Sequence, residues 1–222
     1  MNLNKTENTF VLGIFLALTG LLAALLLAYS ARVTAAPIAA AAAENANKSL
    51  RAVLPHFKSQ KTTVFNGITF TAVFDENGKF TGIAGAFNAK GYGGDITTLV
   101  GMNPDGTVRT VLITENNETP GLGSNVCTRK EHKTITSIFK SEKNSDALPP
   151  NRILDYYSGK SVKTNDAPWK ITKDGGSCEY LTGATISSRA VCDAVYKIVS
   201  TCTANQEKIL TQIENSNTAE NK

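Results

Sequence analysis

The sequence has few of the residues from which metal centres and nucleic-acid-binding surfaces are built. It has two histidines, His56 and His132, to which we assign no catalytic function, and four cysteines that form no Cys-x-x-Cys pair. Zinc and iron–sulfur sites are therefore not supported. The net charge is only +4, and the 23 basic residues are interleaved with 19 acidic ones. This balance is typical of a solvated surface and does not indicate a nucleic-acid partner.

One long stretch has no charge at all. Residues 10–29 are interrupted only by Thr19 and two glycines, and as a helix they would extend about 30 Å, enough to span a bilayer. The alternative is a signal peptide cleaved near Ala31, but the apolar region of such a peptide is usually only about 7–15 residues long. We therefore expect a retained transmembrane helix at residues 9–31, after a short N-terminal segment at residues 1–8. Because it carries no ionisable side chain, we expect this helix to anchor the chain and not to conduct ions.

The remaining chain predicts one α+β domain behind the anchor. Residues 32–58 carry an alanine-rich run and apolar residues at helical spacing, which predict a connecting helix. Residues 59–214 have the mixed strand and helix patterns of a domain, and residues 215–222 form a polar tail. With 222 residues, the chain is long enough to bury one substantial core without metal or disulfide staples.

Two hairpins are predicted in the first part of that domain. Apolar residues alternate through 68–74 and again through 80–87, on either side of a turn at 75–78, and a second pair of strands is predicted at 96–100 and 107–114. Together they predict a mainly antiparallel sheet of about four to six strands.

Helices are expected to pack on this sheet. A short helix is predicted at 130–139, a further strand at 169–173, and a tight turn at 174–176 (DGG). A closing helix is predicted from near Ser187. Its apolar stripe continues to Ile213 and predicts packing in the core.

Two loops are dense in glycine. Residues 90–95 (KGYGGD) lie between the hairpins, and residues 118–123 (ETPGLG) follow the second hairpin. Glycines would let backbone N–H groups approach the edge of a flat ring system, while Tyr92 or Leu122 covers its face. Ordinary turns are the alternative that composition alone allows.

The functional interpretation depends most on residues 181–188 (LTGATISS), where a small, hydroxyl-rich loop runs into the closing helix. The first N–H groups of a helix lack intrahelical partners and lie at the positive end of its dipole, so they favour an anion such as a phosphate. Gly183 and Ala184 are small and would let the hydroxyl of Thr182 or Thr185 come close to that anion. The alternative is a threonine or serine that caps the helix without any ligand.

The tetrad Thr182-Gly183-Ala184-Thr185, with Glu179 three residues before it, resembles the flavin-transferase target motif of the G subunit of the Rnf complex. The motif also occurs in the related C subunit of the sodium-translocating NADH:quinone oxidoreductase. That family has Asp where this chain has Glu179, which keeps the charge. The loops at 90–95 and 118–123 and the turn at 174–176 occur in the family's order, and the hexapeptide at 118–123 matches it residue for residue.

The resemblance implies an FMN-binding domain in which Thr185 carries FMN through a phosphoester bond. No base is evident near Thr185, so a separate flavin transferase that uses FAD would make the bond. The other cofactor-binding residues that we expect are Thr182, Gly183, Ala184, Ser187, Glu118, Thr119, Leu122, Gly123 and Tyr92.

The same resemblance implies a function and partners. The chain would be an electron-carrying subunit of a membrane complex that passes electrons between ferredoxin and NAD and moves Na+ or H+ across the membrane. Its partners would be the other membrane subunits, and its domain would lie on the extracytoplasmic side of the cell membrane. The short chain and the Tyr92 that follows Gly91 favour the Rnf branch. The alternative is a membrane-anchored, non-redox domain that binds a small ligand or a partner protein.

The four cysteines are Cys127, Cys178, Cys192 and Cys202. In an extracytoplasmic domain, Cys127 and Cys178 are candidates for a disulfide because both lie near the glycine-rich loops. The alternative is that they are buried thiols, which behave as small hydrophobic residues. Cys192 and Cys202 would lie about 15 Å apart along one helix, too far to bridge each other.

Overall fold

The computed structural model describes residues 3–129, 148–162 and 168–220. The helix expected at 130–139 lies outside the described residues. The chain forms two compact units, residues 1–47 and residues 48–222. They are described separately below.

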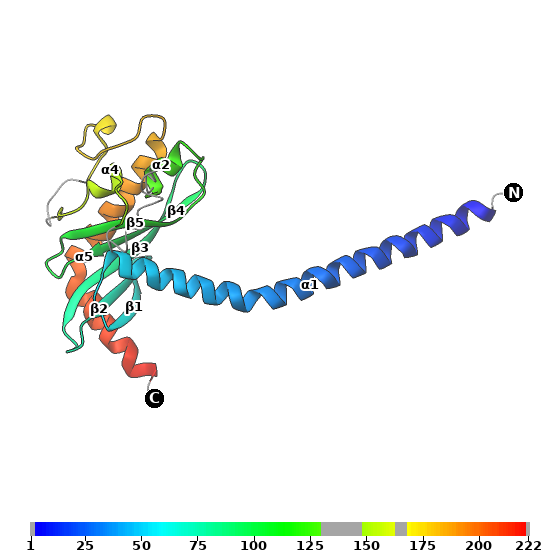
Figure 1. Cartoon of the computed structure of the whole chain (residues 1–222), viewed down its shortest axis with the longest axis horizontal. Helices are drawn as coiled ribbons and strands as arrows, with labels where there is room; N and C mark the ends of the chain where they lie inside the picture. The colour runs from blue at the N-terminus through cyan, green and yellow to red at the C-terminus, as the bar shows by residue number, and fades with distance from the viewer. Residues whose placement is uncertain (1–2, 130–147, 163–167, 221–222) are drawn as a thin grey trace, which may run out of the picture. The chain divides into compact units, whose positions relative to one another are not determined.

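The first unit contains most of helix α1, which runs from Leu3 to Val53; residues 48–53 of this helix belong to the second unit (Figure 1). The part from Thr9 onward is long and apolar enough to cross a membrane, with a mean hydropathy of 2.7 in its most apolar window. The helix continues through Pro37, so the predicted anchor and the predicted connecting helix are one element. It ends at Val53 because Pro55 follows two residues later and disfavours helical geometry in the residue before it.

The second unit is built on a five-stranded antiparallel sheet in the order β1-β2-β3-β4-β5. Its strands are β1 (Ser59–Phe65), β2 (Ile68–Phe74), β3 (Phe80–Lys90), β4 (Asp95–Met102) and β5 (Val108–Asn116). This arrangement confirms the two predicted hairpins and the α+β class. The sequence pattern did not predict β1, because most of its residues are polar or exposed, as in an edge strand.

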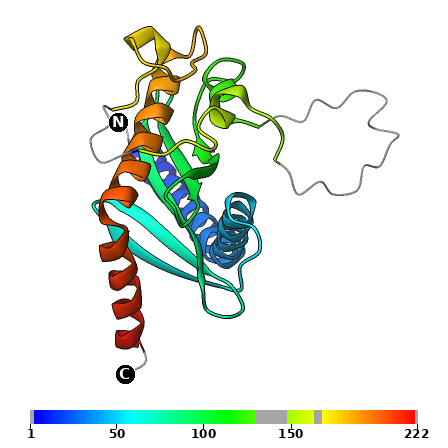
Figure 2. The ribbon, with the colours of Figure 1, turned by 90° about the vertical axis from the view of Figure 1, so that its left-hand side faces the viewer.

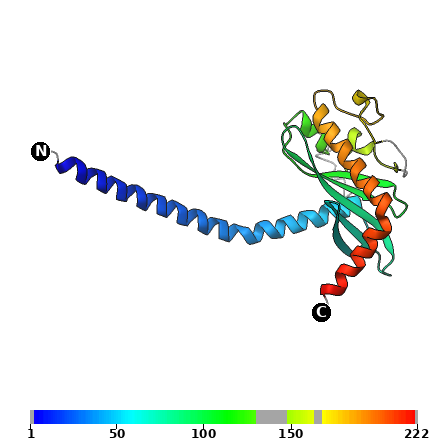
Figure 3. The same ribbon diagram turned by 180° about the vertical axis from the view of Figure 1, so that it is seen from behind.

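Helix α5 (Thr185–Glu220) covers one face of the sheet, as Figures 2 and 3 show from two sides. Gly85 on β3 makes the close approach possible, since a Cβ there would meet the side chain of Ile198. The core between the two layers contains Ile68, Phe70, Ile83, Val100, Val111, Val191, Val195 and Ile198. The helix begins two residues before the predicted position and stays buried as far as Ile213, with a non-helical residue at Asn205.

The last turn of α1 and the residue after it pack on the opposite face of the sheet. Leu50, Val53 and Leu54 form a second cluster with Val73 and Ala84. Val73 and Ala84 follow Ala72 and Ile83, which belong to the main core, and neighbouring residues of a strand point to opposite faces. Helical residues therefore pack on both faces of the sheet, α5 on one and the end of α1 on the other.

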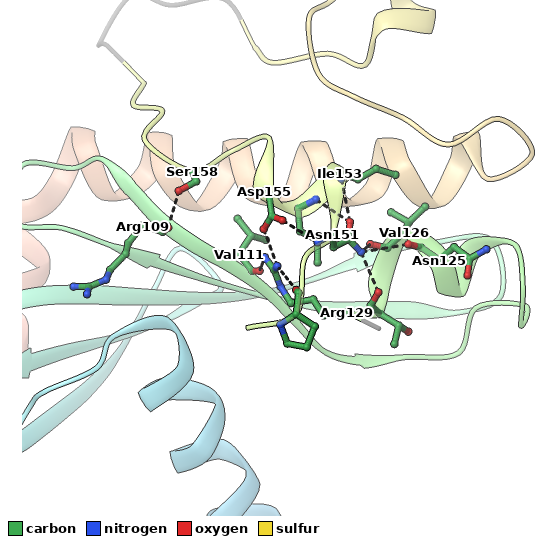
Figure 4. A network of polar contacts seen from close by, with 12 residues as sticks. Arg109, Val111, Asn125, Val126, Arg129, Asn151, Ile153, Asp155 and Ser158 are labelled. Atoms are coloured by element: carbon green, nitrogen blue, oxygen red, sulfur yellow. Dashed lines mark hydrogen bonds and ion pairs between the residues drawn. The ribbon is translucent and has the colours of Figure 1, made fainter. Parts of the chain in front are cut away.

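Two short helices and a buried arginine close one end of the domain. The helices are α2 (Gly123–Cys127) and α4 (Arg152–Asp155). Asn151 caps α4 through its Oδ1 atom, and its Nδ2 donates to the carbonyl of Val126 at 3.2 Å. Arg129 donates to Asp155 at 2.7 Å and to the carbonyl of Val111 on β5 at 3.0 Å (Figure 4). These contacts fix α2 and α4 against the sheet.

The expected strand at 169–173 is wrong. Ile171 makes only an isolated parallel bridge with Cys178, and a short 3-10 helix, η1, runs from Thr172 to Asp174. The predicted Asp-Gly-Gly turn does form, with Gly175 at a φ of 81°, a value that favours glycine. This turn folds the segment back, so that the N–H of Cys178 donates to the carbonyl of Lys170. The backbone is thus paired within its own segment and needs no place in the sheet.

All four cysteines are buried free thiols, so the disulfide between Cys127 and Cys178 does not form in this structure. Burial raises the pKa of Cys127 to about 12, with the carboxylate of Glu118 acting in the same direction. The pKa of Cys178 is lowered, chiefly by its interaction with Cys192. The thiol beside Cys178 is therefore that of Cys192 on α5.

Candidate functional site

A cavity of about 620 Å³ opens where the N-terminus of α5 meets the two glycine-dense loops. This volume is typical of small-molecule sites, which range from about 300 to 1,000 Å³. The cavity is lined by Tyr92, Glu118, Thr119, Leu122, Gly123, Lys173, Gly183, Ala184, Thr185, Ile186, Ser187 and Arg189. Nine of the ten residues predicted as cofactor-binding line it. The exception is Thr182, which is exposed and lies outside the lining.

Glu118 connects the three segments that form the cavity. Its side chain is buried, with 6% of the residue exposed. Oε1 accepts hydrogen bonds from the N–H groups of Tyr92 at 2.8 Å and Gly93 at 3.1 Å. Oε2 accepts one from the hydroxyl of Ser187 at 2.7 Å. We call this arrangement of Glu118, Tyr92, Gly93 and Ser187 the Glu118 clasp. It fixes both loops to the start of α5.

The glycines of these loops make room for the clasp. A Cβ at Gly91 would meet Oε1 of Glu118, and a Cβ at Gly123 would meet Oε2 and lie 2.8 Å from Oγ of Ser187. Both positions therefore require glycine because a carboxylate stands beside them. From the sequence we expected these glycines to let the backbone approach a flat ring. Their contact with the Glu118 carboxylate was not predicted.

Three apolar side chains of the cavity are open to solvent. Tyr92 is 73% exposed, Leu122 is 50% exposed and Ile186 is 46% exposed. Exposed large apolar groups that gather around one cavity mark a binding site rather than a core. They are the kind of surface that a flat ring system would cover.

The four hydroxyls of residues 181–188 differ in what they contact. Ser187 is buried and donates to Glu118, while Ser188 is buried, donates to the carbonyl of Ala184 at 2.9 Å and accepts from the N–H of Leu181 at 3.1 Å. Thr185 is half-buried and lines the cavity. Of the four, it alone presents a hydroxyl to the cavity without being held by the protein backbone or by the clasp.

The start of α5 has free backbone donors. The N–H of Ser188 is the first to bond within the helix, to the carbonyl of Ala184. Within the described residues, the N–H groups of Thr185, Ile186 and Ser187 have no acceptor, as expected for a helix start. The residue before the helix is Ala184, whose side chain cannot cap it, so the interpretation of this stretch as a threonine or serine cap does not hold.

Two cations in the lining were not predicted. Nζ of Lys173 lies 3.5 Å from Oγ1 of Thr185. Arg189 donates two hydrogen bonds to Asp174, at 2.7 and 2.9 Å, and this guanidinium holds the pKa of the Asp174 carboxyl below its usual value of 3.8. We call Thr185, Lys173 and Arg189 the cationic end of the cavity. Arg189 could have been found from its spacing, four residues after Thr185 and on the same face of the helix.

Glu179, the acidic residue before the tetrad, does not line the cavity. Its carboxylate pairs with Nε of Arg152 at 2.8 Å, and both side chains are partly exposed. Glu179 is therefore held by a surface ion pair and makes no contribution to the cavity lining.

Residues 91–200, about half of the chain, match the family model of the FMN-binding domain. This stretch begins in the loop that carries Tyr92 and ends within α5, so it contains every residue of the cavity. Residues 91–200 therefore form a domain of this FMN-binding family.

Its relatives among curated proteins include several that are named as the G subunit of an ion-translocating oxidoreductase complex. The chain is 36% identical to that of Aliivibrio fischeri strain MJ11 over 137 residues, which is 61% of this chain and 56% of the relative. It is 29% identical to that of Cereibacter sphaeroides over 202 residues, 86% of this chain and 83% of the relative. The match thus spans little more than half the length of the first relative. The chain is therefore similar to these G subunits, over part of its length to the first and over most of it to the second.

A solved structure, NqrC of Shewanella oneidensis, is also similar. It is 18% identical, has a TM-score of 0.43 and covers 70% of both chains.

Proposed function

We propose that this protein is the electron-carrying subunit of a membrane-bound, ion-translocating ferredoxin:NAD oxidoreductase of the Rnf type. In this proposal it holds FMN in the cavity at the start of α5, joined to Thr185 by a phosphoester bond. The family match over residues 91–200, the names of its relatives and the cavity, with its exposed apolar side chains beside a helix start, support the FMN site. When bound, FMN accepts and donates one or two electrons, and the protein holds and orients it.

The observation that carries the proposal is the state of the Thr185 hydroxyl. It faces the cavity, whereas the hydroxyls of Ser187 and Ser188 are buried and hydrogen-bonded to other groups of the chain. An attached phosphate would lie at the free N–H groups of α5, which favour an anion. Thr185 is therefore the residue we assign as the attachment point.

Attachment needs a partner enzyme. No carboxylate or imidazole of the described residues hydrogen-bonds to Oγ1 of Thr185, and an unactivated hydroxyl is a poor nucleophile. A flavin transferase would supply the base and FAD. The bond from Oγ1 to the phosphorus of the FMN part forms, the bond between the two phosphates of FAD breaks, AMP leaves and the hydroxyl proton passes to the transferase.

The anchor and the location follow from the same proposal. Helix α1 would hold the protein in the cell membrane beside the other membrane subunits of the complex. The domain would lie on the extracytoplasmic side, where a covalent bond prevents loss of a cofactor that cannot be replaced from the cytoplasm. The uncharged apolar stretch of α1 would anchor the domain without conducting ions.

The mass of the denatured protein tests the attachment. We expect wild type co-expressed with a flavin transferase to be heavier than the bare chain by one FMN less one water, and its denatured band to fluoresce under ultraviolet light. Thr185→Ala should lose both signals completely, because the other hydroxyl of the stretch that lines the cavity, that of Ser187, is buried and donates to Glu118.

A control variant makes the assignment specific. Ser187→Ala should keep the adduct, although it also removes a hydroxyl two residues from Thr185. A band that stays fluorescent in Thr185→Ala would move the attachment to another residue. A wild-type mass equal to the bare chain would instead favour a non-covalent, non-redox binding domain.

A further inference from the structure

The cationic end of the cavity carries more positive charge than its own carboxylate neutralises. Lys173 and Arg189 are positive and Asp174 is negative, and both carboxylate oxygens of Asp174 are bonded to Arg189. Within the described residues, no carboxylate forms an ion pair with Lys173. Lys173 therefore brings to the cavity a charge that no ion pair holds, with its Nζ 3.5 Å from Oγ1 of Thr185.

The position of Lys173 depends on the pair between Arg189 and Asp174. Lys173 and Asp174 are neighbours in the 3-10 helix η1, whereas Arg189 lies on the first turns of α5. Two parallel hydrogen bonds from a planar guanidinium fix both distance and orientation. The pair thus holds η1 against α5 and places Lys173 over the end of the helix where Thr185 lies.

We propose that Lys173 binds the phosphate group of the flavin, and that Arg189 is a positioning residue that acts through Asp174. This inference takes the identity of the ligand from the proposed FMN function, but it does not require the covalent bond to Thr185. It follows that the unmodified domain recognises FMN before the ester is made. When a transferase delivers the FMN part of FAD, its phosphate would meet the same Lys173 at Thr185, and after the ester forms the remaining negative charge stays beside Lys173.

Comparison of FMN with riboflavin, which lacks the phosphate, tests this inference. Full-length wild type would be purified in detergent from cells that lack a flavin transferase, and each flavin titrated by the quenching of its fluorescence. We expect FMN to bind about tenfold more tightly than riboflavin, since a hydrogen bond to a charged group contributes that much or more. Added salt should weaken FMN binding and leave riboflavin binding unchanged.

Variants of two lysines separate a local effect from net charge. Lys173→Gln should remove most of the preference for FMN, and Lys173→Arg should restore it. Lys170→Gln makes the same change of charge three residues earlier, on a side chain outside the cavity lining, and should keep the preference. Equal loss of the preference for FMN in Lys173→Gln and Lys170→Gln would overturn the proposal.

Asp174→Asn tests the positioning function of Arg189. If only net charge mattered, removal of a negative charge beside the cavity would strengthen FMN binding. If the pair positions Lys173, the substitution weakens FMN binding about two- to threefold, a small effect because the pair is partly exposed. Stronger FMN binding by Asp174→Asn would overturn the positioning argument.

The outcomes distinguish this inference from the proposed function. Equal affinities for FMN and riboflavin, or no measurable binding of either, would overturn the inference even if the transferase still produced the covalent adduct. A clear preference for FMN without any adduct would support the inference and overturn the covalent attachment.

Discussion

The two ends of the cavity are built in opposite ways. The Glu118 clasp is buried and holds three donors of the chain on one carboxylate, between glycines that leave no room for a larger residue. The cationic end is open to solvent, and the side chains of its pair between Arg189 and Asp174 are 45% and 31% exposed. Buried polar contacts are costly to break, whereas exposed ion pairs contribute little to stability. The clasp therefore fixes the shape of the cavity, and the cationic end selects the charge of the ligand.

The largest effect on stability is expected for Glu118→Ala. The substitution leaves the N–H groups of Tyr92 and Gly93 and the hydroxyl of Ser187 without their acceptor. We expect the free energy of unfolding to fall by about 2–4 kcal/mol. Urea unfolding of the full-length protein in detergent, followed by the fluorescence of the single tryptophan, Trp169, measures it.

An exposed glutamate provides the matched control. Glu115→Ala, on strand β5, removes the same carboxylate from a surface position and should change the free energy of unfolding by less than about 0.5 kcal/mol. Similar losses for the two variants would mean that Glu118 contributes no more than a surface charge. The contrast between the two ends of the cavity would then be lost.

Gly123→Ala should have the next largest effect. Its Cβ would meet Oε2 of Glu118 and lie 2.8 Å from Oγ of Ser187, so one of the two must move. Such overpacking costs about 1–3 kcal/mol, measured by the same unfolding titration. A double-mutant cycle shows whether the clasp is the cause. In the Glu118→Ala background, Gly123→Ala should cost clearly less, and strictly additive losses would contradict this explanation.

The contrast between the two ends also explains what the sequence could predict. Strands β2 to β5 followed from the alternation of apolar residues and from the turns between them. Strand β1 was not predicted because its side chains are mostly polar. The strand expected at 169–173 was wrong, because the Gly175-Gly176 turn lets this segment pair with itself.

The site was predicted in part for a similar reason. Local motifs identified Thr185 and both glycine loops, since these segments are continuous in sequence. The hydrogen bonds of buried Glu118 join it to Tyr92 and Ser187, which are 26 and 69 positions away in the sequence. Lys173 reaches the cavity only because η1 packs on α5. Contacts between distant segments leave no periodic pattern, so only the folded structure reveals them.

The smallest effect on stability is expected at the cationic end, where pH changes it in a defined direction. Arg189 holds the pKa of Asp174 below 3.8 in the folded state, so the pair is stabilising above that pH and its contribution is lost as the pH falls through the lowered pKa. Near neutral pH, Asp174→Asn should lower the free energy of unfolding by less than Gly123→Ala does, because the pair is partly exposed. Urea titrations of wild type and Asp174→Asn should converge as the pH falls below 3.8, and at neutral pH added salt should reduce their difference. A difference that persists in acid would show that Asp174 stabilises the fold through something other than its charge. A neutral-pH loss as large as that of Glu118→Ala would show that the open end of the cavity is as structural as the buried one.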